Sequence, residues 1–298
     1  MFKHLLVPLD GSRLAEAALP LTRDLATRTG AAVTLFHVLE KNAPDQIHGE
    51  PHLTDPATAD AYMTRIASDL RASGLTVDWH VHDVAVPDVA ESITRHAVEL
   101  GIDLIVLSTH GQGGVRDLVF GTIAQQVIGH GDTPVFLIHP ESAPDHFPAK
   151  RYLVPLDGKA EHGSSIPLAE GLAKRLGAQI HYLTVVPRRS DLGGTTGATA
   201  RLLPTAMTAL LDHREVEAGA FLERLAEKTK AAGTPATTQV ERGEPATVIL
   251  QALKEAGSDL LVLSTHTRKG WAAFWQGSVA PRIIAQWPHP TLLVRAKA

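Results

Sequence analysis

The sequence predicts an α/β protein made of two tandem domains, each with an open parallel sheet, related by internal duplication. Two observations lead to this fold class. Short apolar runs rich in branched residues alternate with longer amphipathic segments, as buried strands alternate with helices in a parallel sheet. The same pattern restarts near residue 150, and 298 residues are enough for two domains with a core each.

The duplication is visible in repeated landmarks. Val154–Gly158 (VPLDG) repeats Val7–Gly11. Further pairs follow at constant offsets: Pro167 with Pro20, Gly177 with Gly30, Ser264 with Ser108, Gly277 with Gly121, and Pro290 with Pro134. Pro140–Lys150 is rich in proline and has no apolar period, so we expect a linker there. The predicted domains are therefore 1–140 and 150–298.

The elements of the first half are assigned from apolar periodicity and from glycine and proline positions. The expected strands are Lys3–Leu9, Ala32–Leu39, a more exposed Leu75–Val84, Leu104–Leu107 and Val135–Ile138. The expected helices are Leu14–Thr29 (kinked at Pro20 or ordered only in its later turns, and capped by Gly30), Ala59–Ser73, Pro87–Leu100 and Ile123–Ile128. Lys41–Thr58 is expected to be a polar connection, and the Gly/Thr-rich Arg188–Thr205 a mobile loop.

The composition excludes several classes of protein. The net charge of −4 disfavours a nucleic-acid or anionic-membrane partner. The chain has no cysteine, so it forms no disulfides and performs no thiol chemistry. The Phe2–Leu9 run is too short for a signal peptide core, and no run approaches the ~18 apolar residues of a membrane span. We expect a cytoplasmic protein.

The stretch Leu104–Gln126 carries the chemistry of the first half. A buried strand ends at Ser108, a loop with three glycines follows, and Gly121-Thr122 opens a helix. Backbone N–H groups in such a loop, together with the positive end of a helix dipole, form a site for phosphate. Three glycines could also simply form a tight turn. Leu260–Ile283 is the related stretch of the second half.

Other familiar signatures are absent. Gly111-x-Gly113 has Arg116 where a dinucleotide fingerprint needs its third glycine, and Gly158-Lys159 lacks the rest of a Walker loop. The metalloprotease motif His-Glu-x-x-His and the hydrolase motif Gly-x-Ser-x-Gly do not occur.

The remaining pattern resembles the universal stress protein family, once in each half. Nucleotide-binding members of that family carry Gly, two residues, Gly, nine residues, then Gly-Ser or Gly-Thr. The first half has Ser108–Gly111, nine residues and Gly121-Thr122, so only the first glycine is replaced. The second half has Ser264–Thr267, nine residues and Gly277-Ser278, so both early glycines are replaced. The aspartate after the first strand also matches, as Asp10.

The resemblance implies a Rossmann-like, adenine-nucleotide α-hydrolase-like fold with strand order 3-2-1-4-5, and a ligand where that order reverses. The implied ligand is ATP, ADP or AMP, with or without Mg²⁺. The implied binding residues are Asp10, Val38, Leu107, Ser108, Gly111, Gly121, Thr122 and Ile123 in the first half, and Asp157, Val185, Ser264, Gly277 and Ser278 in the second. Asp10 could instead be only a helix cap.

Several histidines and aromatic residues have two interpretations. His110 and His266 recur in both halves, but such a histidine more often orders its own loop than catalyses a reaction. His80 and His82 point to one face of a strand and could bind a metal, although the sequence shows no third ligand. Trp271, Phe274 and Trp275 could stack on a base or pack against the sheet.

The function predicted from the sequence is a tandem universal stress protein, a nucleotide-binding stress-response module with little or no turnover. The sequence shows no general base, no Mg²⁺-binding carboxylate beside the loop and no arginine aimed at a γ-phosphate. The alternatives are an interaction scaffold without nucleotide and an enzyme that cleaves ATP at the α-phosphate. We also expect the last strands, Val135–Ile138 and Thr291–Val294, to pair in an intrachain pseudo-dimer, with or without a further homodimer.

Overall fold

The computed structural model describes residues 1–41, 43, 46–47, 49–109, 122–157, 163–265 and 279–295. The described residues form two compact units. The first contains residues 1–148 and 288–295, and the second contains residues 149–265 and 279–287. The last strand of the sequence therefore belongs to the first unit.

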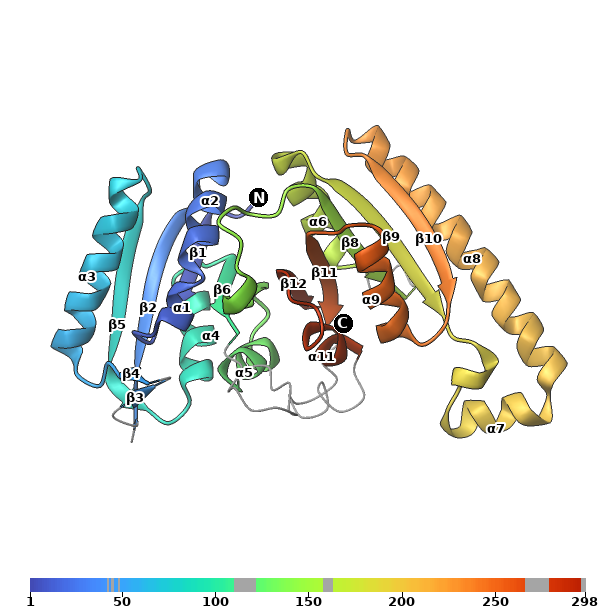
Figure 1. The fold of residues 1–298 in the computed structure, drawn as a ribbon, viewed down its shortest axis with the longest axis horizontal. Helices are drawn as coiled ribbons and strands as arrows, with labels where there is room; N and C mark the ends of the chain where they lie inside the picture. The colour runs from blue at the N-terminus through green and yellow to red at the C-terminus, as the bar shows by residue number, and fades with distance from the viewer. Residues whose placement is uncertain are drawn as a thin grey trace. The chain divides into compact units, whose positions relative to one another are not determined.

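The first unit is a mostly parallel sheet with helices packed on it (Figure 1). Its strands are β1 (His4–Pro8), β2 (Ala32–Glu40), β5 (Val77–Val86), β6 (Leu104–Ser108), β7 (Val135–Ile138) and β12 (Thr291–Arg295), in the spatial order β12-β7-β6-β1-β2-β5. All five residues of β6 are buried. Because successive side chains of a strand point to opposite faces, both faces of this part of the sheet are covered.

The helices of the first unit are α1 (Arg13–Glu16), α2 (Leu19–Thr29), α3 (Pro56–Ala72), α4 (Val89–Glu99) and α5 (Thr122–His130). The helix expected over 14–29 is divided, because Pro20 lacks a backbone N–H and lies in the first turn of α2. The left-handed cap at Gly30 is confirmed by its φ of 74°. Pro87 lies outside α4, contrary to the expectation, because Asp88 is the residue that caps this helix.

Two connections of the first unit are more ordered than the sequence indicated. The polar segment after β2 contains a small hairpin, β3 (Gln46–Ile47) with β4 (Glu50–Pro51). The linker begins with a 3₁₀ turn, η1 (Pro140–Ser142), and then packs on the unit. Phe147 is buried and stacks on Phe136 with ring centroids 4.8 Å apart. One apolar side chain in a proline-rich segment has no periodicity, so the pattern could not show this contact.

The second unit repeats the arrangement with the strand order β10-β9-β8-β11. Its strands are β8 (Arg151–Leu156), β9 (Gln179–Val186), β10 (Ala236–Arg242) and β11 (Leu260–Thr265), and they pair in parallel where the register is given. Its helices are α6 (Ser165–Leu176), α7 (Gly194–Leu202), α8 (Pro204–Ala231), α9 (Pro245–Glu255) and α11 (Val279–Ile284), with a 3₁₀ turn η3 (Arg189–Asp191).

The prediction of a loop over Arg188–Thr205 is wrong. This segment forms η3 and α7, and α8 begins before it ends. Ala200 of α7 packs in one buried cluster with Val186, Met207 and Leu211. Glycine and threonine lower the helix propensity of this segment, but burial of its apolar face against α8 and β9 outweighs that preference.

An aspartate just before β6 in the first half, and another just before β11 in the second, bind the backbone where the first strand of that half begins. The Asp103 carboxylate accepts hydrogen bonds from the backbone amides of Lys3 and His4 at 2.7 and 3.2 Å. Its counterpart Asp259 accepts from the amides of residues 149, 150 and 151 at 3.1, 2.8 and 2.8 Å. Each aspartate thereby holds the start of the first strand of its half, β1 or β8, beside the neighbouring strand, β6 or β11.

The predicted pairing of the last strands is confirmed. β12 pairs antiparallel with β7, with Leu292 opposite Phe136. This pairing gives β7 a neighbour on its outer side, which removes an apolar edge that could otherwise aggregate. The pseudo-twofold arrangement of the two halves, and any homodimer, stay predictions.

Candidate functional site

The candidate site of the first unit lies where the strand order reverses. β1 pairs with β2 on one side and with β6 on the other. From β1 the chain moves outward first through β2 and β5, and later through β6 and β7. The strand order therefore reverses at β1 and β6, and open α/β sheets bind ligands at the carboxyl ends of such strands. Asp10 follows β1, and Ser108 ends β6.

The loop after β1 has a fixed conformation. The Asp10 carboxylate accepts hydrogen bonds from the backbone amide and the hydroxyl of Ser12, at 2.9 and 2.7 Å. Ser12 in turn caps α1 by accepting from the Ala15 amide at 3.1 Å. Gly11 has a φ of 91°, a conformation that residues with a Cβ rarely adopt. A Cβ on Gly11 would also lie 2.8 Å from Cγ of Leu53.

His37 joins this loop to β2 and to the segment before α3. It is 2% exposed, and its Nδ1 lies 2.7 Å from the carbonyl oxygen of Leu9. Its Nε2 lies 3.0 Å from the carbonyl oxygen of Leu53. The next residue, Val38, is 7% exposed, near the carboxyl end of β2. His37 thus holds the Asp10 loop close to the strand that carries Val38.

Ser108 is the most informative residue of the site. It is 7% exposed, and its Oγ has no hydrogen-bond partner among the residues that the structure describes. A buried hydroxyl without a partner costs about 1–3 kcal/mol. The preceding residue, Leu107, is also buried, whereas Ile123 on α5 is 39% exposed. A polar ligand that entered beside β6 would supply a partner for Ser108, which has none among the described residues.

The second half places the corresponding residues differently. Asp157 follows β8 and is exposed, and Val185 lies near the end of β9. Ser264 on β11 donates its hydroxyl hydrogen to Oγ of Ser165 at 2.8 Å, and its own Oγ lies 3.4 Å from that of Ser164. Alanines occupy the equivalent positions 17 and 18 of the first half. The hydroxyl of Ser264 therefore has a partner, whereas that of Ser108 has none in the part of the chain that the structure describes.

Several predicted residues lie outside the described residues. These are Gly111, Arg116, Gly121, Thr267, Gly277 and Ser278, the side chain of Thr122, the loop histidines His110 and His266, and the aromatic residues Trp271, Phe274 and Trp275.

One residue near the site was not anticipated from the sequence. His139 directly follows β7, and its Nδ1 lies 3.1 Å from Oγ1 of Thr109, which itself donates to the carbonyl oxygen of Ile138. The Nε2 of His139 is buried with no partner in the described part of the chain. Burial lowers the pKa of His139, because desolvation disfavours the charged imidazolium. A lone histidine after a strand carries no signal of its own in the sequence.

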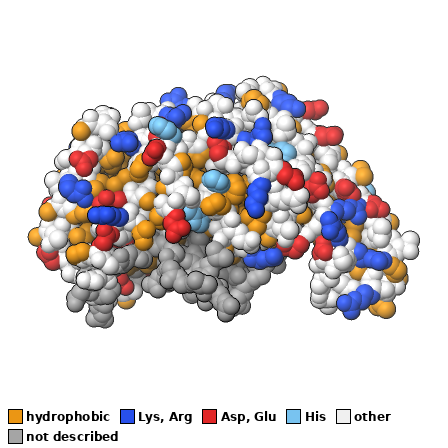
Figure 2. Space-filling view, in the orientation of Figure 1, with side chains coloured by type: hydrophobic (Ala, Val, Ile, Leu, Met, Phe, Trp, Pro, Cys, Tyr) orange, Lys and Arg blue, Asp and Glu red, His pale blue; other side chains and the backbone are white. Residues whose placement is uncertain are grey.

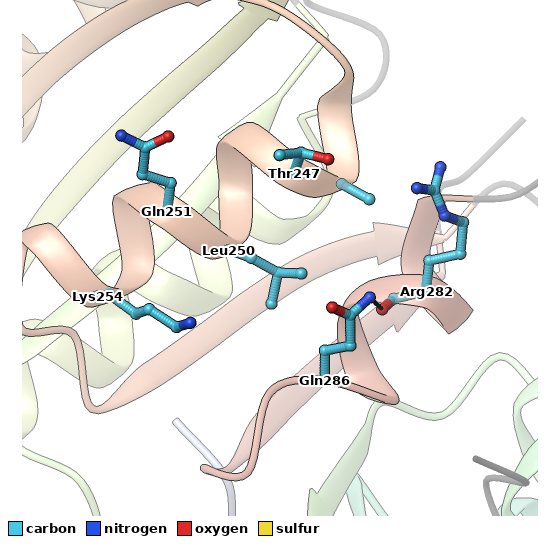
Figure 3. Close-up of a pocket in the computed structure, with 7 residues that line it drawn as sticks. Thr247, Leu250, Gln251, Lys254, Arg282 and Gln286 are labelled. Atoms are coloured by element: carbon cyan, nitrogen blue, oxygen red, sulfur yellow. Dashed lines mark hydrogen bonds between the residues drawn. The ribbon is translucent and has the colours of Figure 1, made fainter. Parts of the chain in front are cut away.

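A separate pocket of about 350 Å³ lies between α9 and α11 in the second unit (Figure 3). It is lined by Ala246, Thr247, Leu250, Gln251, Lys254, Arg282 and Gln286. None of the predicted nucleotide residues lines it. Arg282 is also engaged by Glu244, the residue that caps α9, with a 2.6 Å ion pair. Burial alone would raise the pKa of Glu244, but hydrogen bonds from Thr247, Arg282 and Ala246 lower it to about 2.

The visible surface mixes charges of both signs. Figure 2 shows basic and acidic side chains interspersed with hydrophobic ones over the face that it draws. This distribution agrees with a net charge of −4. None of the helices in the described ranges combines the length and apolar character needed to cross a bilayer.

The fold defines a class: a tandem of open-sheet α/β domains, a kind of domain in which ligands bind where the strand order reverses. The model of the universal stress protein family matches the chain twice, over residues 1–139 and 148–295. The chain therefore belongs to the universal stress protein family, as a tandem member.

Individual relatives agree with this assignment. A universal stress protein of Mycolicibacterium smegmatis is 22% identical over 305 residues, which cover 98% of this chain and 97% of that protein. A universal stress protein of Thermus aquaticus is 30% identical over 143 residues, which cover 46% of this chain and 99% of that protein. The crystal structure of a universal stress protein from Archaeoglobus fulgidus has the same fold, with a TM-score of 0.70 at 15% identity, and covers 98% of this chain and 96% of its own.

Proposed function

We propose that the first repeat binds an adenine nucleotide at the carboxyl ends of β1 and β6. In this proposal the protein is a cytoplasmic regulatory module of the stress response that binds ATP, ADP or AMP with little or no turnover. The observation that carries the proposal is the buried Ser108 hydroxyl, which has no partner among the described residues and ends the strand beside β1.

The surrounding groups suit the parts of a nucleotide. The Asp10 carboxylate can accept hydrogen bonds from ribose hydroxyls, and it would repel phosphate, so the sugar belongs on its side of the site. Val38 presents main-chain groups to the adenine edge. The phosphates then extend from Ser108 and Gly111 toward the helix start at Gly121-Thr122, where backbone N–H groups and the helix dipole favour anions.

The second repeat is proposed to bind nucleotide weakly or not at all. Ser264 is bonded to Ser165, so binding there would first have to break an existing hydrogen bond. Thr267 also stands where the first half has Gly111. If that position requires a positive φ, a β-branched residue there is strained by roughly 1–3 kcal/mol. This asymmetry favours a scaffold role for the second repeat, the alternative function that the structure supports best.

Calorimetric titration of the full chain with ATP, ADP and AMP, with and without Mg²⁺, tests the proposal. We expect one nucleotide per chain. Ser108→Ala should weaken binding by about 2- to 12-fold, the equivalent of one hydrogen bond of about 0.5–1.5 kcal/mol. The same change should not lower stability, because it removes an unpartnered buried hydroxyl. Gly121→Val should abolish binding, because a side chain would stand where phosphate approaches the N–H groups.

The matched control is Ser264→Ala, which should leave the affinity of the tight site unchanged. Two equal sites per chain would contradict the asymmetry. A wild-type chain that binds no nucleotide, or a Gly121→Val chain that binds normally, would contradict the proposal itself. Release of pyrophosphate from ATP would favour the enzyme alternative.

A further inference from the structure

Three histidines converge in the first unit, outside the set of residues predicted to bind nucleotide, although His82 is the register partner of Val38. His80 and His82 lie on β5, and His96 lies on α4. One ring nitrogen of each lies within 4.8 Å of the corresponding nitrogens of the other two. Within the described ranges, this is the only group of three or more histidine, cysteine or acidic residues close enough to hold a metal ion.

The local sequence explains why these three side chains meet. His80 and His82 are two residues apart on a strand, so both side chains project from the same face. β2 and β5 pair in parallel, with Phe36 opposite His80 and Val38 opposite His82. The helix α4 packs against β2, and His96 lies on the buried side of this helix. The third histidine, which the sequence could not identify, comes from a helix 14 residues later in the chain than His82.

The ring of His96 is held in one orientation. It is 8% exposed, and its Nδ1 lies 2.8 Å from the backbone carbonyl oxygen of Ser92. A carbonyl oxygen can only accept, so Nδ1 carries the hydrogen and Nε2 carries the lone pair. Metal-binding histidines have this arrangement, in which a carbonyl fixes the tautomer and the second nitrogen faces the ion.

The ring of Phe36 contacts the rings of His80 and His96. Phe36 is fully buried, and the His80 ring stacks on it with centroids 5.7 Å apart and planes within 9°. The His96 ring lies 4.8 Å from Phe36, 5.3 Å from His80 and 4.9 Å from His82. His80 is exposed and His82 partly exposed, so an ion can reach the cluster from solvent.

We propose that His80, His82 and His96 form a binding site for a divalent transition-metal ion, with Zn²⁺ the ion that fits best. Three imidazoles and one open position, filled by water, make a tetrahedral N₃ site. Tetrahedral Zn²⁺ with Zn–N bonds of 2.0–2.1 Å needs its nitrogens about 3.3 Å apart. Starting from separations of up to 4.8 Å, each nitrogen would move by roughly 0.8 Å, which small ring rotations supply.

Acidic and basic side chains both lie beside the cluster, and the acidic one can offset the charge of a bound cation. Glu99 lies 3.9 Å from Nε2 of His96 and 3.6 Å from Arg95, so it can compensate charge on either group.

The test is a titration of the full, untagged chain with Zn²⁺ against a chromophoric chelator, with Co²⁺ as a spectroscopic probe. We expect one tight Zn²⁺ per chain, a rise in Tm with Zn²⁺, and the intense visible absorption of tetrahedral Co²⁺. His80→Gln and His82→Gln should each weaken Zn²⁺ binding by about 100-fold, because two imidazoles hold the ion much less tightly than three. These two side chains are exposed or partly exposed, so both variants should fold.

The matched control is His181→Gln. His181 is also a strand histidine, but its ring nitrogens lie 2.8 and 2.7 Å from oxygens of Thr237 and Gln239. This control should bind Zn²⁺ like the wild type. His96→Gln should abolish the Co²⁺ absorption if circular dichroism shows that it folds. The proposal is overturned if the wild type takes up no stoichiometric Zn²⁺, if His80→Gln and His82→Gln bind as tightly as the wild type, or if His181→Gln weakens binding equally.

Discussion

Gly11 is the position at which the structure makes the sharpest prediction about stability. Its φ of 91° disfavours any residue with a Cβ by roughly 1–2 kcal/mol. The added Cβ would also lie 2.8 Å from Cγ of the buried Leu53, and overpacking of this kind costs about 1–3 kcal/mol. Gly11→Ala should therefore destabilise the first unit by about 2–5 kcal/mol, the two terms together. The same change should weaken nucleotide binding, because it displaces the loop that carries Asp10.

Two further variants separate the effect of the backbone conformation from that of the contact with Leu53. Gly30 also has a positive φ, 74°, but an added Cβ there meets nothing within 4 Å. Gly30→Ala should thus cost only the backbone part, about 1–2 kcal/mol. In the double variant Gly11→Ala with Leu53→Ala, the contact is removed. Its destabilisation should fall short of the sum of the single changes by about 1–3 kcal/mol.

Urea unfolding followed by far-ultraviolet circular dichroism measures these differences, and calorimetric titration with ATP measures the binding. If Gly11→Ala lowers the free energy of unfolding no more than Gly30→Ala does, the contact with Leu53 adds no strain to the substituted loop. If the double variant is additive, the same conclusion follows. If stability falls as expected but ATP affinity is unchanged, the Asp10 loop does not belong to the nucleotide site.

Three other predictions concern polar groups. The pKa of Glu244 is lowered to about 2 from 4.5, so its stabilising contribution is present above pH 4.5 and is lost as the pH falls toward 2. Because this side chain is 36% exposed, we expect Glu244→Gln to cost only about 1 kcal/mol at pH 7, and the difference from wild type to vanish in acid unfolding curves. Asp259→Ala should cost more than Asp103→Ala, by about 1 kcal/mol in urea unfolding, because it leaves three backbone amides without their acceptor and not two. Tyr182→Phe removes a buried hydroxyl that bonds to a glutamate and a threonine, and should lower Tm, at a cost of about 1–2 kcal/mol.

Local sequence determined the strands and helices with short-range signals. β7 has the predicted bounds, and the left-handed caps at Gly30 and Gly177 stand where the sequence indicated. These features depend on residues within one or two turns of each other, so a short window contains the whole signal. The repeated VPLDG motif likewise established the duplication without any three-dimensional information.

Contacts between distant segments were decided only in the tertiary structure. Phe147 is buried in a segment without periodicity, and α7 forms in a segment whose composition disfavours a helix. In both cases burial against another element outweighs local preference, and the sequence does not say which element will be there.

The sites show the same division. The sequence determined which groups stand at the carboxyl ends of the strands, because strand ends and glycines are local features. Only the packed structure decided that Ser264 is bonded by a serine of α6 whereas Ser108 is not, and that His96 joins His80 and His82. Strand register and helix packing bring such residues within a few ångströms of each other. Neither can be predicted from the spacing of the residues along the chain.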